Sequence, residues 1–232
     1  MALNPWFVFS LALFVVWLLL WLFKPKLRKE MFWVSLFTMP FGLTEPLFVP
    51  EYWSPPSLFN LATKTGFDIE SLIFSFAVGG IGAVLYEVLV KAKHQKLGKH
   101  EKHGKKHMFH FLALSSPVIV FLLLQLFTKL NPIYSASMAM FAGGIAAILC
   151  RPDLKRKIWM GGISFLTLYF VFFLLFNLAY PSLVQKVWNL SAISGILLLG
   201  VPIEELLFAF TFGIFWSSVY EHILWYKVVK GE

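Results

Sequence analysis

The sequence predicts an all-α integral membrane protein with seven transmembrane helices, arranged as two parallel three-helix repeats joined by a linker helix. Hydrophobic side chains make up 59% of the 232 residues and charged ones only 14%, whereas a soluble domain carries roughly 25% charged residues. The single cysteine, Cys150, cannot form a disulfide within the chain. This composition excludes a disordered chain, a disulfide-linked secreted domain and an ordinary cytosolic enzyme.

Seven apolar segments account for the predicted spans, because each is close to the length of about 20 residues that a membrane-crossing helix needs. The segment 31–49 is interrupted by Pro40 and Glu45, and the segment 132–150 is rich in Ala and Gly, which permits close helix packing. The run 187–203 is broken by polar residues and is expected to be a loop or a short interfacial helix. The predicted spans are residues 2–23, 31–49, 69–90, 108–128, 132–150, 158–180 and 203–226.

Lysine and arginine residues predict the orientation of these spans. Residues 24–30, 91–107 and 151–157 and the tail after Tyr226 hold all but three of the 20 basic residues, and seven spans place these segments on one side. Connections rich in Lys and Arg are cytoplasmic. We therefore expect a multi-pass protein of the cell (inner) membrane, with the N-terminus outside and the C-terminus inside. The net charge of +8 then needs no nucleic-acid partner.

The basic connection 91–107 contains seven lysines and four histidines. A metal site or an anionic-lipid site is one interpretation of this composition. A positively charged anchor that links two halves of the chain is favoured, because the histidines lack a tight metal-ligand spacing. The sequence therefore predicts no metal. These histidines are His94, His100, His103 and His107.

An internal repeat divides the chain. Residues 66–93 align without gaps with residues 200–227 and share ten identities over 28 positions. Pro46 and Trp53 recur as Pro181 and Trp188. The linker helix adds one crossing, so the two copies are expected to run parallel, about an axis along the membrane normal. The predicted divisions are 1–93 for the first repeat, 94–130 for the basic loop and linker helix, and 131–232 for the second repeat.

The four carboxylates that begin predicted spans are the candidate catalytic groups, because charge in a membrane is costly and usually functional. Asp68 and Glu70 begin one predicted span, Glu204 and Glu205 begin another, and Glu45 lies near the outer end of a third. Helix capping explains Asp68 equally well. It explains the adjacent pair less well, since neighbouring side chains point about 100° apart on a helix. The recurrence of Glu70 as Glu204 predicts facing carboxylates, one of which keeps its proton.

Aromatic residues one to three turns beyond these glutamates predict substrate contacts, because aromatic faces stabilise a cation. Ordinary packing or contact with lipid is the alternative for any single ring. Two Tyr-Glu pairs recur at the opposite ends of the helices and are interpreted as interfacial anchors that pair with nearby lysines. The predicted substrate contacts are Glu45, Phe74, Phe208, Thr211 and Phe215.

The motif Pro202-Ile203-Glu204-Glu205, within the tandem layout, resembles the lycopene cyclase domain of heterodimeric bacterial cyclases and of fused archaeal and fungal ones. The resemblance implies that two units make one enzyme. It implies acid–base closure of a linear carotene end group to a β-ionone ring, without a metal or flavin cofactor. Glu204 and Glu205 match the motif, while the first copy reads Asp68-Ile69-Glu70-Ser71 and lacks the proline and the second glutamate. The expected partners are a long, lycopene-like polyene and membrane lipids, and homo-oligomerisation stays open.

The sequence bears on three other classes of membrane protein. A retinal-binding rhodopsin needs a lysine in the last span, and residues 203–226 contain none. An intramembrane protease of the Glu-Glu-x-x-x-Arg type would need arginine where Ala209 stands. A proton-coupled transporter, or a non-catalytic carotenoid-binding protein, stays open as an alternative. Transporter carboxylates usually lie near the membrane midplane, whereas these lie near one end.

Overall fold

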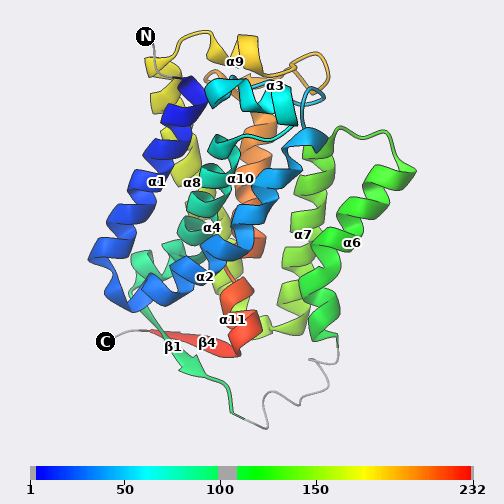
Figure 1. The fold of residues 1–232 in the computed structure, drawn as a ribbon. Helices are drawn as coiled ribbons and strands as arrows, with labels where there is room; N and C mark the ends of the chain where they lie inside the picture. Colours follow the sequence, from blue (N-terminus) through cyan, green and yellow to red (C-terminus); the bar gives the residue numbers. More distant parts are fainter. Residues whose placement is uncertain (1–3, 99–108, 231–232) are drawn as a thin grey trace. The chain divides into compact units, whose positions relative to one another are not determined.

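The computed structural model describes residues 4–98 and 109–230, and it is predominantly α-helical (Figure 1). The predicted all-α class is confirmed. His100, His103 and His107 lie outside the described residues. Within the described residues, six helical segments are long and apolar enough to cross a membrane. These are α1 (Pro5–Phe23), α4 (Ile69–Val90), α6 (His110–Phe127), α7 (Pro132–Cys150), η5 with α8 (Pro152–Ala179), and α10 with α11 (Ile203–Leu224).

The remaining predicted span, residues 31–49, is not one α-helix. Helix α2 (Arg28–Thr38) ends after 11 residues and continues as the 3-10 helix η2 (Met39–Leu47). Proline at positions 40 and 46 explains the change, because it lacks the N–H that an α-helix interior needs. An α-helix of this length covers about 16 Å, less than the hydrocarbon core of about 30 Å. The seven-span count therefore stays a prediction.

The last predicted span, 203–226, also differs from the structure. Helix α10 (Ile203–Trp216) is followed by the short helix α11 (Val219–Leu224) and then by strand β4 (Tyr226–Lys230). Strand β4 pairs antiparallel with β1 (Ala92–Lys96), with Lys93 opposite Val229 (Figure 1). Neither strand was predicted, because five residues at the end of a helix carry too little periodicity to distinguish a strand from a tail.

The run 187–203 is not a span, as the sequence indicated. It follows the five-residue helix α9 (Leu183–Val187) and contains the two-residue strands β2 (Leu197–Leu198) and β3 (Val201–Pro202), which pair antiparallel. The turn between them includes Gly200 with a φ of 82°, a backbone conformation that glycine adopts without steric cost. This hairpin leads directly into α10 and so positions the first turn of that helix.

The chain forms two compact units. The first unit comprises Met1–Ile81, Asn131–Ile133 and Leu168–Leu206. The second comprises Gly82–Leu130, Tyr134–Thr167 and Leu207–Glu232. Each unit takes residues from both predicted repeats, and the division at residues 93 and 130 stays a prediction.

Close packing in the first unit depends on small residues in α4. A Cβ atom at Gly79 would lie 2.7 Å from Cβ of Thr38, so only glycine allows α2 to approach this closely. The Thr38 hydroxyl also donates to the Ser75 carbonyl at 2.8 Å. Helix α1 is joined to α2 by the Trp17 indole N–H, which donates to the Ser35 hydroxyl at 2.9 Å. These contacts fix the three helices that precede and carry the first-copy carboxylates.

The second unit has its own apolar core, in which Leu154, Ile158 and Ile214 are fully buried. Helices α8 and α10 pack so closely that their backbones are in contact. A Cβ atom at Gly213 would lie 2.6 Å from the carbonyl oxygen of Gly161. Small residues at this crossing therefore permit the contact, as is typical of helices packed in a membrane.

The predicted orientation can be tested with reporter fusions at the two ends of the chain. Seven spans place the termini on opposite faces, so a fluorescent reporter at the C-terminus is expected to fold in the cytoplasm. A protease-sensitive tag at the N-terminus is expected to be cleaved from outside in intact spheroplasts. Protection of the N-terminal tag, with the C-terminus still cytoplasmic, would indicate an even number of spans and contradict the count.

Candidate active site

Glu205, in the first turn of α10, accepts hydrogen bonds from three side chains of the first unit. The Tyr52 hydroxyl donates to its Oε1 atom at 2.5 Å, and the Trp188 indole N–H donates to the same atom at 2.9 Å. The Tyr169 hydroxyl donates to Oε2 at 2.7 Å. The side chain is buried. Three donors from three separate segments therefore hold one carboxylate away from solvent.

Two loop segments bring the Tyr52 and Trp188 donors together. Trp53 and Trp188 form an isolated antiparallel β-bridge. The Asn189 N–H donates to the Tyr52 carbonyl at 2.9 Å, and the Ser54 N–H donates to the Val187 carbonyl at 2.8 Å. Trp53 and Trp188 are equivalent positions of the sequence repeat. The bridge therefore joins the two repeated tryptophans, one of which donates to Glu205.

Aromatic rings surround these donors. The Trp188 ring lies 5.5 Å from the Phe173 ring and 5.4 Å from the Trp53 ring, measured between centroids. The Phe74 ring lies 6.4 Å from the Tyr169 ring, at an interplanar angle of 69°. Phe74, a predicted substrate contact, thus belongs to the aromatic group around Glu205. Such rings present negative faces that attract a cation.

Glu45, on η2 and outside the six candidate spans, is the second buried carboxylate of interest. The Ser71 hydroxyl donates to its Oε2 atom at 3.2 Å. Burial, together with the negative charge of the nearby Asp68, raises the pKa of Glu45 to about 8, and hydrogen bonds with Ser71 and Trp53 oppose that rise. A carboxyl group in this environment holds its proton at neutral pH.

Glu205 and Glu45 come from different kinds of element, and the sequence repeat shows where the two copies differ. In the gapless alignment of the two copies, Ser71 occupies the position of Glu205. The first copy therefore has no carboxylate of its own at this position of α4. The Ser71 hydroxyl instead contacts Glu45, so a carboxylate from η2 lies beside the position that glutamate occupies in the second copy.

Asp68, Glu70 and Glu204 contact backbone at the starts of helices. Asp68 accepts the Ser71 N–H at 2.5 Å, as a helix cap does. Glu70 accepts the Leu58 N–H at 2.6 Å, and Glu204 accepts the Ser194 N–H at 3.0 Å. Both glutamates thus fix the loop that precedes their helix. That Glu70 and Glu204 face each other stays a prediction.

The other three predicted substrate contacts belong to the second unit. The Thr211 hydroxyl donates to the Leu207 carbonyl of its own helix at 2.9 Å. Phe208 packs on Phe212 with ring centroids 5.5 Å apart, and Phe215 packs on Trp216 at 5.3 Å. Their role in substrate binding stays a prediction.

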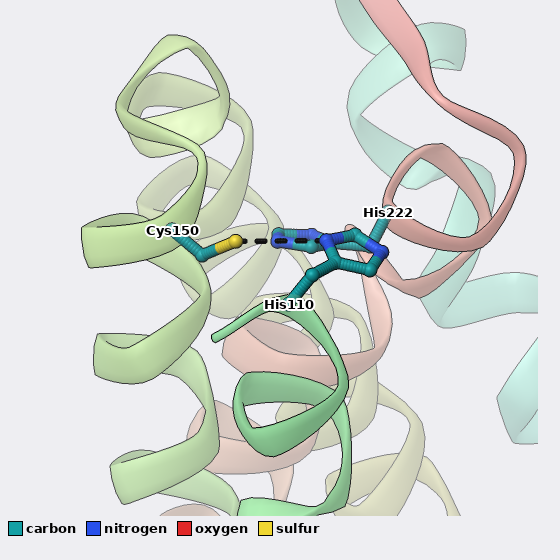
Figure 2. A group of neighbouring side chains, drawn as sticks. All are labelled: His110, Cys150 and His222. Carbon is teal, nitrogen blue, oxygen red and sulfur yellow. Dashed lines mark hydrogen bonds between the residues drawn. The ribbon is translucent and has the colours of Figure 1, made fainter. Parts of the chain in front are cut away.

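Two further polar clusters lie in the second unit. In the first, His110, Cys150 and His222 place one potential metal-ligand atom each within 4.8 Å of the others (Figure 2). All three residues are buried. No spacing in the sequence indicates this cluster, since its members come from α6, α7 and α11.

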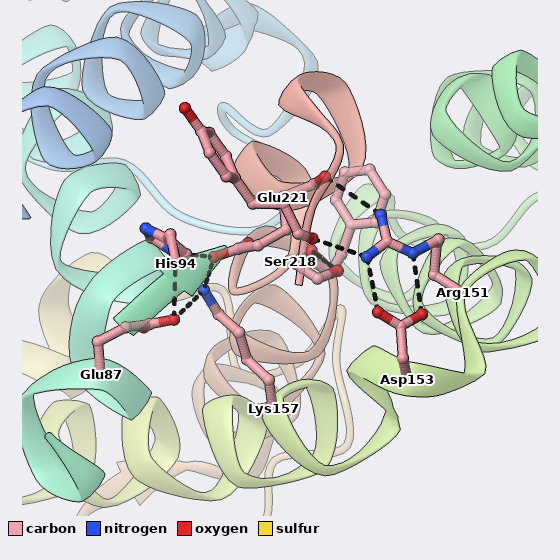
Figure 3. Close-up of polar contacts among 9 residues, drawn as sticks. Glu87, His94, Arg151, Asp153, Lys157, Ser218 and Glu221 are labelled. Atoms are coloured by element: carbon pink, nitrogen blue, oxygen red, sulfur yellow. Dashed lines mark hydrogen bonds and ion pairs between the residues drawn. The ribbon is translucent and has the colours of Figure 1, made fainter. Parts of the chain in front are cut away.

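The second cluster is a buried ion-pair network. Figure 3 shows Lys157 lying between Glu87 and Glu221, with its Nζ atom 2.5 Å from Oε1 of Glu87 and ion-paired with Glu221 as well. The His94 ring contacts Glu221 at 2.6 Å. The pairing of these repeated glutamates with a lysine is confirmed. Both glutamates are buried within the protein, and their position at the membrane interface stays a prediction.

The sequence does not predict the donors Tyr52, Tyr169 and Trp188. The available signal for Trp188 was that tryptophan recurs at positions 53 and 188, seven residues after Pro46 and Pro181. Tyr169 offers no comparable signal. It lies within a long apolar run, and its contact with Glu205 depends on tertiary packing alone.

The acceptor role of Glu70 yields a test of stability. Alanine at position 70 removes the acceptor of the Leu58 N–H and of the Asn4 amide, and is expected to lower the free energy of unfolding by about 1–3 kcal/mol. Glutamine keeps the side-chain oxygen and is expected to retain most of that stability. Unfolding of the purified variants in detergent measures both values. Equal losses would contradict the acceptor role.

A comparison with protein families matches the family described as lycopene cyclase over residues 4–89 and 131–223. The two matched regions contain Glu45, Tyr52, Tyr169, Trp188 and Glu205, and they leave out residues 90–130. No curated protein and no solved structure matches the chain. Because the match covers most of the chain, the protein belongs to the lycopene cyclase family, whose members are membrane enzymes of carotenoid biosynthesis.

Proposed function

We propose that the protein is a lycopene β-cyclase-like isomerase, which closes the end group of a linear carotene to a β-ionone ring within the membrane. The observation that carries this proposal is the environment of Glu205. A buried carboxylate held by three donors and surrounded by aromatic rings suits a reaction that passes through a carbocation.

The proposed reaction begins with proton transfer to the terminal double bond of the polyene, which leaves a tertiary cation. The neighbouring double bond attacks this cation, forms the ring carbon–carbon bond and moves the positive charge into the ring. Loss of a ring proton then restores a double bond. One proton enters and one leaves, so the reaction is an isomerisation. It needs an acid, a base and a site that tolerates a cation.

Glu45 is our candidate for the acid. Its pKa of about 8 keeps the carboxyl group protonated at neutral pH, because burial and the charge of Asp68 both disfavour the anion. The Ser71 hydroxyl contacts one carboxyl oxygen and so restricts the orientation of the group. Paired carboxyl groups in different environments are a common way to divide acid and base roles.

Glu205 is our candidate for the group that stabilises the cation and accepts the ring proton. The Trp188 indole N–H donates to Oε1 of Glu205, and a donor of this kind favours the charged form of a carboxyl group. The two tyrosine hydroxyls add further donors to the carboxylate. A carbocation is a very strong acid, and therefore even a weakly basic carboxylate can take its proton. Proton exchange with water then restores both groups for the next turnover.

Asp68, Glu70 and Glu204 are assigned positioning roles in this proposal. Their contacts with the Ser71, Leu58 and Ser194 backbone amides support that assignment. The motif shared with the family includes both Glu204 and Glu205. On this account its two glutamates differ in function, since Glu204 fixes the preceding loop and Glu205 faces the reaction.

Pigment analysis in lycopene-accumulating bacteria tests the proposal. The wild-type protein is expected to convert lycopene to a cyclised carotene. Loss of a positioned acid or base lowers rates by about 10²–10⁴-fold, so Glu45→Gln and Glu205→Gln are each expected to abolish detectable product. Glu51→Gln is the matched control, because Glu51 is an exposed glutamate of the same unit.

Two outcomes would contradict the proposal. Unchanged lycopene in cells that contain folded wild-type protein would indicate a non-catalytic carotenoid-binding protein or a carrier. Full activity in Glu205→Gln would exclude Glu205 from the chemistry. Membrane fractionation and detergent size-exclusion chromatography establish that each variant is folded.

A further inference from the structure

We propose that His110, Cys150 and His222 form a binding site for a thiophilic transition-metal ion, Zn²⁺ or Cu⁺. Imidazole and thiolate groups are the ligands that both ions prefer. Each residue offers one ligand atom, and the three atoms lie within 4.8 Å of one another. All three side chains are buried in the second unit (Figure 2).

The spacing of the sulfur and nitrogen atoms fits a coordinated ion. The Cys150 Sγ atom lies 3.5 Å from Nδ1 of His110. With metal–sulfur and metal–nitrogen distances of about 2.3 Å and about 2.0–2.1 Å, two ligands of a tetrahedral site are separated by roughly 3.5 Å. The existing separation therefore accommodates an ion without movement of α6 relative to α7.

The ring of His222, which is buried and unpartnered in the described part of the chain, supports the site separately from the spacing of the sulfur and nitrogen atoms. Its side chain has no exposed surface, and neither ring nitrogen has a hydrogen-bond partner among the described residues. Its ring lies beside that of His110, with centroids 5.3 Å apart and an interplanar angle of 25°. A buried imidazole without a partner is unfavourable. Coordination of an ion would give one of the two ring nitrogens a partner at the point where the other two ligands lie.

The local charge is compatible with a cation. Arg151 follows Cys150 directly, but its guanidinium is paired with Asp153 at 2.6 Å. Binding of the ion displaces the thiol proton, which leaves for solvent, and the resulting thiolate offsets one positive charge. Cu⁺ would leave the three-ligand site neutral, whereas Zn²⁺ would leave one positive charge and an open fourth position.

We do not propose a metal site at the other group of potential ligands in this unit. Glu87, His94 and Glu221 also lie close together, but Lys157 forms ion pairs with both glutamates. The lysine ammonium therefore already supplies the positive charge that a metal ion would bring. His94 consequently offers a matched control for the histidines of the proposed site.

The proposed ion would fasten α6 to the rest of the second unit. Within α6, only His110 and Ala113 are buried, and most of its surface faces away from the described chain. His110 is the first residue of α6, Cys150 is the last residue of α7, and His222 lies in α11. An ion bound by all three residues would link α6, α7 and α11 and would stabilise the packing of α6.

Metal loading of the full-length protein in detergent micelles tests this inference. Purified wild-type protein is incubated separately with Zn²⁺, with Co²⁺ as a coloured substitute for Zn²⁺, and with Cu⁺ under a reductant. We expect one bound ion per chain by elemental analysis, a sulfur-to-cobalt charge-transfer band, and a rise in melting temperature that a chelator reverses. Comparison of the Zn²⁺ and Cu⁺ arms identifies the preferred ion.

Variants locate the ion. Cys150→Ser and His222→Gln are expected to lose stoichiometric binding and the chelator-sensitive shift in melting temperature, while His94→Gln retains both. The wild-type spectrum needs no variant, because Cys150 is the single cysteine and any thiolate band must arise from it. Folded wild-type protein that binds none of the three ions would overturn the proposal. Binding that persists in Cys150→Ser and His222→Gln would overturn it as well.

Discussion

The burial of the Glu205 carboxylate is the constraint on which the site depends. An isolated charge inside an apolar protein is very costly, and it is tolerated when donors surround it. Those donors come from the segment after η2, from α8 and from the end of α9. The backbone bridge between Trp53 and Trp188 holds two of these segments together. Much of the first unit can therefore be understood as a scaffold that brings three distant donors to one carboxylate.

In our proposal, the acid and base roles follow from the different residues that the two sequence copies place at equivalent positions. The second copy places a glutamate at position 205 and supplies donors to it. The first copy places Ser71 there and brings Glu45 from η2, where burial beside Asp68 favours the protonated form. A symmetric pair of carboxylates would have equal tendencies to hold a proton. In the proposed mechanism, this difference between the two positions lets one group donate a proton while the other accepts one.

The sequence predicted the features that composition and local pattern control. Long apolar runs identified the six segments that qualify as spans, and the glutamate pair after Pro202 identified Glu205. Residues 31–49 are α-helical only as far as Thr38, because Pro40 and Pro46, six residues apart in the second half, favour a 3-10 helix there. Tyr52 is 153 residues from Glu205 in sequence, so only tertiary packing reveals their contact. The same holds for the cluster of His110, Cys150 and His222, whose members lie on three helices.

The central claim is that ring closure adds one solvent-derived proton and removes another, without oxidation or reduction. Conversion of lycopene by membranes containing the protein in buffered D₂O tests this claim most directly. Because the acid regains its proton from solvent in each turnover, we predict one deuterium per ring formed. It should lie in the ring methylene beside the carbon that bears two methyl groups, as shown by mass spectrometry and NMR. Cyclised product without deuterium, or ring closure that requires an added oxidant or reductant, would contradict the account.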